Sequence, residues 1–140
     1  MKEKSCGAVI IDNGKVLLIR QNNGDCGFPK GHVEEGETEQ QTAIREVKEE
    51  TNVDIVIDSD QRYVISYVVK NDIMKDVIYF LAHPINNQQL IAQPEEIDEV
   101  MWVDIDKVYD ILKKGTKEAR ESVKETLKDV KHAMKIDYFE

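Results

Sequence analysis

The chain is poor in cysteine, in long apolar runs and in basic residues, and each shortage excludes a class of protein. Its two cysteines, Cys6 and Cys26, cannot build a disulfide framework and favour a reducing, cytoplasmic setting. No apolar run reaches the ~18 residues of a membrane-spanning helix, and the opening MKEKSCGAVI lacks a signal-peptide pattern. With 28 acidic against 19 basic residues, the net charge of −9 argues against general nucleic-acid binding.

The 140 residues predict a single domain, residues 1–140, without repeats or linkers. Strands are expected over residues 4–11, 15–21, 53–57, 61–70, 76–83 and 99–103, with hairpin turns at 12–14 and 71–72. Helices are expected over residues 38–51, from Asp104 or Asp106 to 114, and over 117–134. Strands around a central helix, with more helices at the C-terminal end, indicate a layered α/β (α+β) fold.

The central helix, opened by Thr38 or Glu39, gathers acidic side chains. Glu46, Glu49 and Glu50 are spaced i, i+3 and i+4, so they share one helix face. Clustered carboxylates of this kind suit Mg²⁺ or Mn²⁺, and Mg²⁺ commonly works with phosphate substrates. The apolar face of the helix is expected on the side away from these acids and consists of Ala43, Ile44 and Val47.

Residues 31–53, GHVEEGETEQQTAIREVKEETNV, resemble the Nudix box. The fixed positions are Gly31, Glu37 and the run from Arg45 to Val53, and the match departs only at Asn52, where the family has glycine. Asn is the next best residue for a left-handed helix end, so the departure concerns the end of the helix. The resemblance implies a Nudix α/β/α sandwich with a mixed central sheet. It also implies hydrolysis of a P–O–P bond in a substituted nucleoside diphosphate, with metal ions neutralising the phosphates.

Carried over residue by residue, the resemblance assigns roles within the box. The catalytic acids would be Glu46, Glu49 and Glu50, and the metal ligands would be these three, the carbonyl of Gly31 and an acid from outside the box. For that outside acid we favour Glu96 over Glu99. Glu46 is either a ligand or the base. Arg45 would orient the glutamates, and Glu37 would brace the loop or be a simple first-turn helix charge.

Three further residues are candidates for contacts with the substrate. Lys30, next to Gly31, is well placed for a phosphate. Arg20, at the end of a strand, is a weaker candidate for the same role. Tyr79 would stack on a base or simply pack within its strand.

The flanks of the box narrow the substrate. The run from Phe28 to Glu34, together with residues 5–9 and 77–81, is similar to asymmetric diadenosine tetraphosphate hydrolases, a resemblance that covers roughly residues 4–103. It implies a dinucleoside polyphosphate substrate such as diadenosine tetraphosphate. Two alternatives stay open: a nucleoside triphosphate pyrophosphohydrolase that sanitises the nucleotide pool, and a nucleotide sensor without activity. All four acids of the box are present, which favours an active enzyme over a sensor. The protein is expected to be either a monomer or a homodimer.

Overall fold

The computed structural model describes residues 2–69, 72–86 and 88–112, so the helix expected over 117–134 lies outside the described residues. Neither helix in this part of the chain is long and apolar enough to cross a membrane. The elements, in chain order, are β1 (Lys2–Asp12), β2 (Lys15–Gln21), β3 (Cys26–Gly27), β4 (Lys30–His32), α1 (Glu39–Thr51), β5 (Ile55–Ile57), β6 (Tyr63–Val69), β7 (Ile73–Pro84), β8 (Ile97–Asp104) and α2 (Ile105–Leu112).

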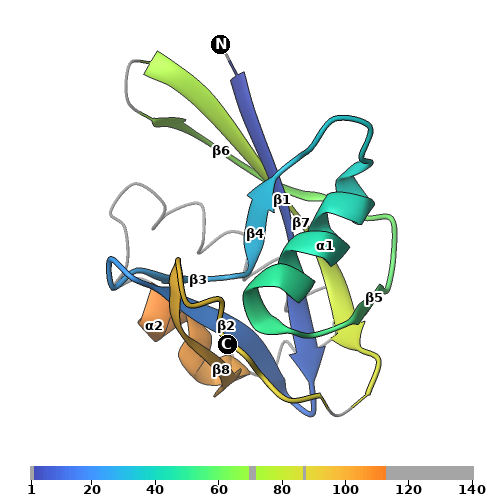
Figure 1. The fold of residues 1–140 in the computed structure, drawn as a ribbon, viewed down its shortest axis with the longest axis vertical. Coiled ribbons are helices and arrows are strands. Elements are labelled where there is room, and N and C mark those ends of the chain that lie inside the picture. The colour runs from blue at the N-terminus through green and yellow to red at the C-terminus, as the bar shows by residue number, and fades with distance from the viewer. Residues whose placement is uncertain (1, 70–71, 87, 113–140) are drawn as a thin grey trace.

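The strands form a mixed sheet centred on β1 and β7, which pair in parallel. Strands β5 and β6 join β7 in antiparallel pairing, and β4 joins the first half of β1. At the far end of β1, β2 continues the sheet and is flanked by β3 and β8. Helix α1 contacts β1 and β7, whereas α2 contacts β2 and β8 (Figure 1). The expected mixed sheet with helices is therefore confirmed.

Two buried clusters, one on each face of the sheet, hold this arrangement together. Successive strand residues point to opposite faces, so Ala8 and Ile10 of β1 join Val47 of α1, while Val9 between them joins Val108 of α2. All five side chains are fully buried. The alternation explains why β1 reads as a nearly continuous apolar run: both of its faces are covered.

The predicted hairpins are both present. Asp12 pairs with Lys15 across Asn13 and Gly14, whose φ values of 52° and 76° are typical of a type I′ turn. Strands β6 and β7 pair as the second hairpin. Strands β1, β7 and β8 run beyond their predicted limits, whereas β5 begins at Ile55 rather than Val53.

The short strands β3 and β4 are additional to the strands expected from the sequence. Strand β4 pairs with β1, bringing Gly31 opposite Cys6 and Lys30 opposite Gly7. A side chain at Gly7 would overlap the carbonyl of Pro29 and the backbone of Lys30. The missing Cβ therefore lets the segment that precedes the acidic helix lie against the central strand.

Helix α1 begins and ends as the sequence predicted. The Oγ1 of Thr38 accepts a hydrogen bond from the Gln41 amide at 3.1 Å, and the Gln41 side chain accepts one from the Thr38 amide at 2.9 Å. This reciprocal pair is a capping box. At the other end Asn52 has a φ of 68°, and its N–H donates to the carbonyl of Lys48.

The predicted apolar face of α1 was wrong in one respect. Ile44 is 39% exposed, and the buried stripe instead contains Ala43, Val47 and Glu50. These three residues are spaced i, i+4 and i+7, which at 100° per residue places them along one side of a helix. Glu50 therefore lies on the face that packs against the sheet, and this residue is only 6% exposed.

Candidate functional site

A cleft of about 550 Å³ opens between the C-terminal half of α1, strand β4 and the loops that precede β3 and β8. Its lining is dominated by charged groups, both carboxylates and ammonium groups. We call it the carboxylate cleft and define it by Glu46, Glu49, Glu50, Glu96, Lys30 and Lys75. Such a cleft is suited to an anionic ligand only if its own negative charge is neutralised.

Glu50 is the most buried acid of the cleft. Its Oε1 accepts a hydrogen bond from the Lys30 amide at 2.9 Å, so strand β4 fixes the carboxylate in place. Burial is the main cause that raises the pKa of Glu50 to about 8. The charges of Glu46 and Glu96 contribute to the rise, and the amide and the charge of Lys30 oppose it. An ionised carboxylate that is buried beside two other acids is destabilised by desolvation and by charge repulsion. A bound cation would offset both effects.

Glu46 lies one helical turn earlier and faces β4. Burial is the main cause that raises its pKa to about 7, with Arg45 opposing the rise and Glu49 and Glu96 contributing to it. A Cβ on Gly31 would overlap the carboxylate of Glu46. Glycine at this position therefore makes room for the acid, a reason that is independent of any metal contact by its carbonyl.

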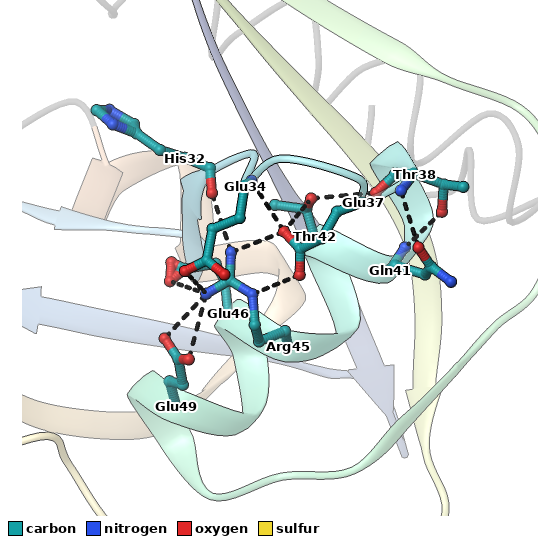
Figure 2. A network of polar contacts seen from close by, with 9 residues as sticks. All are labelled: His32, Glu34, Glu37, Thr38, Gln41, Thr42, Arg45, Glu46 and Glu49. Carbon is teal, nitrogen blue, oxygen red and sulfur yellow. Dashed lines mark hydrogen bonds and ion pairs between the residues drawn. The ribbon is translucent and has the colours of Figure 1, made fainter.

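Arg45 links the acids of the helix to the loop before it (Figure 2). Its Nε donates to Glu37 Oε2 at 2.6 Å and its Nη2 to Glu37 Oε1 at 3.0 Å. The Nη1 lies 3.1 Å from Glu49 Oε2 and 3.4 Å from Glu46 Oε1, while Nη2 also donates to the carbonyl of His32 at 3.0 Å. One guanidinium thus fixes the relative positions of two cleft acids, the loop and β4.

Glu37 lies before the helix rather than in its first turn, because Thr38 is the N-cap. Besides Arg45, its Oε1 accepts hydrogen bonds from Thr42 Oγ1 at 2.9 Å and from the Glu34 amide at 3.0 Å. The bonds from Arg45, together with those from Glu34 and Thr42, hold the pKa of Glu37 at about 2. The geometry is that of a loop brace, and it disfavours the simple helix-charge alternative.

The donors fit a hard divalent cation in their chemistry, since carboxylate and carbonyl oxygens are the ligands that such ions prefer. Their arrangement, however, is not that of an assembled ion site. No three His, Cys, Asp or Glu side chains within the described ranges are grouped closely enough to hold an ion as they stand. Both carboxylate oxygens of Glu49 are within 3.2 Å of Arg45 Nη1. Glu49 would have to turn from Arg45 toward the cleft to become a ligand.

The structure separates the two acids that were considered from outside the box. Glu96 lines the cleft, whereas Glu99 is absent from its lining and pairs with Arg20 at 3.1 Å. The cause is a bulge: Gln21 pairs with Ile97 but Arg20 pairs with Glu99, so Asp98 is the extra residue. Arg20 is also absent from the lining, and its predicted phosphate contact gains no support from this geometry.

Lys30 does reach the cleft, and a second lysine accompanies it. Burial lowers the pKa of Lys30, and the nearby ammonium of Lys75 lowers it further. Sequence reasoning missed Lys75. The signal for it was the strand period, since Lys75, Val77 and Tyr79 share one face of β7.

Tyr79 is 6% exposed, and its ring meets that of Phe28 edge-on with 5.2 Å between the centroids. Burial is the main cause that raises its pKa. With Tyr67 and Val77 it lines a second cavity of about 200 Å³, which shares Lys30 and Gln21 with the carboxylate cleft. The edge-on contact favours packing, and stacking on a base stays a prediction.

Comparisons with known proteins agree with this fold. The family model of the NUDIX domain matches residues 1–126. The asymmetrical bis(5′-nucleosyl)-tetraphosphatase of Sus scrofa is 32% identical over 76% of this chain and 82% of the relative. Among solved structures, the binary complex of the C. elegans Ap4A hydrolase has a TM-score of 0.78 and 28% identity, and covers 94% of this chain and 97% of its own. A MutT NUDIX hydrolase from Burkholderia pseudomallei has a TM-score of 0.64 and 24% identity, and the match covers 76% of this chain and 85% of that protein. This likeness shows the shared fold.

The mixed sheet with its helices and the match of the family model over most of the chain define the class of protein, which is a hydrolase. The chain belongs to the NUDIX domain family and is a Nudix hydrolase. Members of this family generally use divalent metal ions.

Proposed function

We propose that this enzyme hydrolyses a P–O–P bond of a dinucleoside polyphosphate, such as diadenosine tetraphosphate, with the help of Mg²⁺ or Mn²⁺. The observation that carries the proposal is the carboxylate cleft, where five acids, Glu95 among them, and two lysines line one volume of about 550 Å³. That volume is large enough for an extended polyphosphate, and its charges match what a metal-bound polyphosphate requires.

The residues of the cleft divide into three groups. Lys30 and Lys75 bind phosphate oxygens that carry negative charge. Glu49, Glu50 and the carbonyl of Gly31 would hold the ion, and Glu46 or Glu96, whichever is not the base, would complete the ligand set. When bound, the ion neutralises the phosphates and lowers the pKa of a coordinated water. Arg45 and Glu37 hold the glutamate side chains in position. Either Glu46 or Glu96 accepts the proton of the attacking water.

The choice of substrate is supported by relatives that are named as asymmetrical tetraphosphatases in pig, rat, mouse and nematode. Asymmetric cleavage of diadenosine tetraphosphate gives ATP and AMP. A triphosphate pyrophosphohydrolase has only the shared fold in its favour. The retained acids Glu37, Glu46, Glu49 and Glu50 argue against a non-hydrolysing sensor. We also propose a cytoplasmic setting, supported by the free thiols of Cys6 and Cys26.

The test is a product assay with Mg²⁺ that compares diadenosine tetraphosphate with nucleoside triphosphates, ADP-ribose and a diphosphoinositol phosphate. ATP and AMP in equal amounts, lost on adding EDTA and restored by excess Mg²⁺, would support the proposal. Preferred turnover of another substrate would refute the choice of substrate and keep the hydrolase chemistry. Binding of all four without turnover would refute hydrolysis.

Variants test the ligand set. Glu49→Gln and Glu50→Gln each remove one ligand charge at nearly constant shape, so kcat should fall by about 100-fold or more. The exposed Glu35, which lies outside the cleft lining, supplies the matched control Glu35→Gln. Full activity of Glu49→Gln or of Glu50→Gln would contradict the metal assignment.

A further inference from the structure

The segment that carries Glu96 into the cleft has no regular structure of its own. Residues 94–96 form a turn ahead of β8 and depend on bonds from other segments. On the helix side, the Gln93 amide donates to the carbonyl of Glu50 at 3.3 Å. The carbonyl of Gln93 then accepts hydrogen bonds from the amides of Glu96 at 3.3 Å and Ile97 at 2.8 Å. The segment is thereby anchored to the end of α1.

On the other side of the cleft, a single residue holds two consecutive carbonyls of the same segment. The amide of Asn22 donates to the carbonyl of Glu96 at 2.9 Å, and its side-chain Nδ2 donates to the carbonyl of Glu95 at 2.7 Å. The contact with Glu95 joins positions 73 residues apart in the chain. Asn22 therefore fixes the two peptide units on either side of the Glu96 Cα atom.

Asn22 is itself held in a closed loop between β2 and β3. The Gln21 amide donates to the carbonyl of Asp25 at 2.8 Å, and the Gly24 amide donates back to the carbonyl of Gln21 at 2.9 Å. Gly24 has a φ of 92°, which glycine adopts without strain. The loop can therefore act as a fixed support rather than following the segment that it holds.

This support matters because, within the described part of the chain, no hydrogen bond or ion pair holds the Glu96 side chain itself. Glu96 is exposed, so packing does not select its rotamer. The direction of its Cα–Cβ bond follows from the backbone on either side, which Asn22 and Gln93 fix. A displacement of about 1 Å at an active group is enough to lower a rate substantially.

We propose that Asn22 is a positioning residue that holds Glu96 toward the carboxylate cleft. The inference rests on the proposed function, in which Glu96 completes the ligand set or accepts the proton. It adds a residue of the β2–β3 loop, outside the acidic helix. Asn22 also lines the cleft, and the role inferred for it is to act through Glu96.

The test is a double-mutant cycle in the full chain, with diadenosine tetraphosphate and Mg²⁺ as substrate and cofactor. Asn22→Ala removes the side-chain bond and should lower kcat about fivefold with little change in KM. Glu96→Gln should lower kcat about 100-fold or more. The double variant should be no slower than Glu96→Gln alone, because Asn22 acts only through Glu96.

Asn23→Ala is the matched control, since its side chain bonds only Asp25 of the same loop among the described contacts. Its effect should multiply with that of Glu96→Gln. Thermal unfolding checks that each variant folds, and Asn22→Asp, which keeps the shape and removes the donor, replaces Asn22→Ala if that variant is unfolded.

Two results would overturn the inference. Asn22→Ala with unchanged kcat, or with a fivefold loss that persists in the Glu96→Gln background, would show that Asn22 does not act through Glu96. A fully active Glu96→Gln is a different failure, because it would remove Glu96 from the proposed mechanism and Asn22 with it.

Discussion

In the metal-free protein, replacing Glu50 by glutamine should increase stability at pH 8 and change it little at pH 5. Glu50 is buried, and Gln can still accept the hydrogen bond that Oε1 receives from the Lys30 amide at 2.9 Å. The substitution therefore removes the charge and keeps the contact. Any gain in stability measures what the ionised carboxylate costs the fold when no cation is present.

The sign and size follow from the raised pKa of Glu50, about 8 in the folded chain against an ordinary value of 4.5. Because the unfolded chain ionises first, stability is full below about pH 4.5 and falls as the pH rises toward 8. At about 1.4 kcal/mol for each pKa unit, the loss by pH 8 is at most about 4 kcal/mol. Relaxation of water and side chains reduces such penalties, so we expect about 2 kcal/mol.

Urea unfolding in EDTA at several pH values between 5 and 8 measures this effect. The free energy of unfolding of the wild type should fall over the range, and that of Glu50→Gln should fall less, with Glu46 causing part of the remaining slope. The exposed Glu35→Gln should follow the wild type. Adding Mg²⁺ at pH 8 should restore the wild type more than Glu50→Gln. Equal pH slopes in the wild type and Glu50→Gln would refute the reasoning.

Three further changes test other parts of the structure. Arg45→Lys loses the paired bonds to Glu37, and kcat should fall about 10–100-fold in the tetraphosphate assay; an unchanged kcat would contradict the orienting role. Ser5→Ala should raise the free energy of urea unfolding by about 1 kcal/mol, because Ser5 Oγ is buried and has no hydrogen-bond partner in the described structure; a loss of stability would mean that the hydroxyl is bonded, for instance to water. Thr38→Ala removes the cap of α1 and should lower the free energy of urea unfolding by about 1 kcal/mol. A loss of less than about 0.5 kcal/mol would contradict the role of Thr38 as the cap.

Features that depend on neighbours in the sequence could be predicted well. The ends of α1 follow from Thr38 and Asn52, whose effects on the backbone are local. The turn at Asn13 and Gly14 was predicted for the same reason. The mixed sheet was expected from the resemblance to a family, because strand order depends on contacts between distant segments.

Features that depend on tertiary contacts were harder to predict. A helical period shows which residues share a face, but it does not show how wide the buried face is. Glu50 was therefore expected on the side of α1 away from Ala43 and Val47, whereas it is buried along with them. Lys75 enters the cleft only because β7 lies beside β1, on which β4 also pairs. The residues next to Lys75 in the sequence gave no indication that its side chain lines the same cleft as Lys30.

The choice between Glu96 and Glu99 shows what local pattern cannot supply. Both acids lie in one acidic stretch, and their spacing of three residues would place them on opposite faces of a regular strand. The bulge at Asp98 and the start of β8 at Ile97 break that regularity, so Glu99 pairs with Arg20 while Glu96 remains in the turn that faces the cleft. A bulge needs a partner strand, and here the partner is β2, about 80 residues earlier in the chain. The acid that reaches the cleft is therefore selected by the register between β2 and β8, which is a property of the folded sheet.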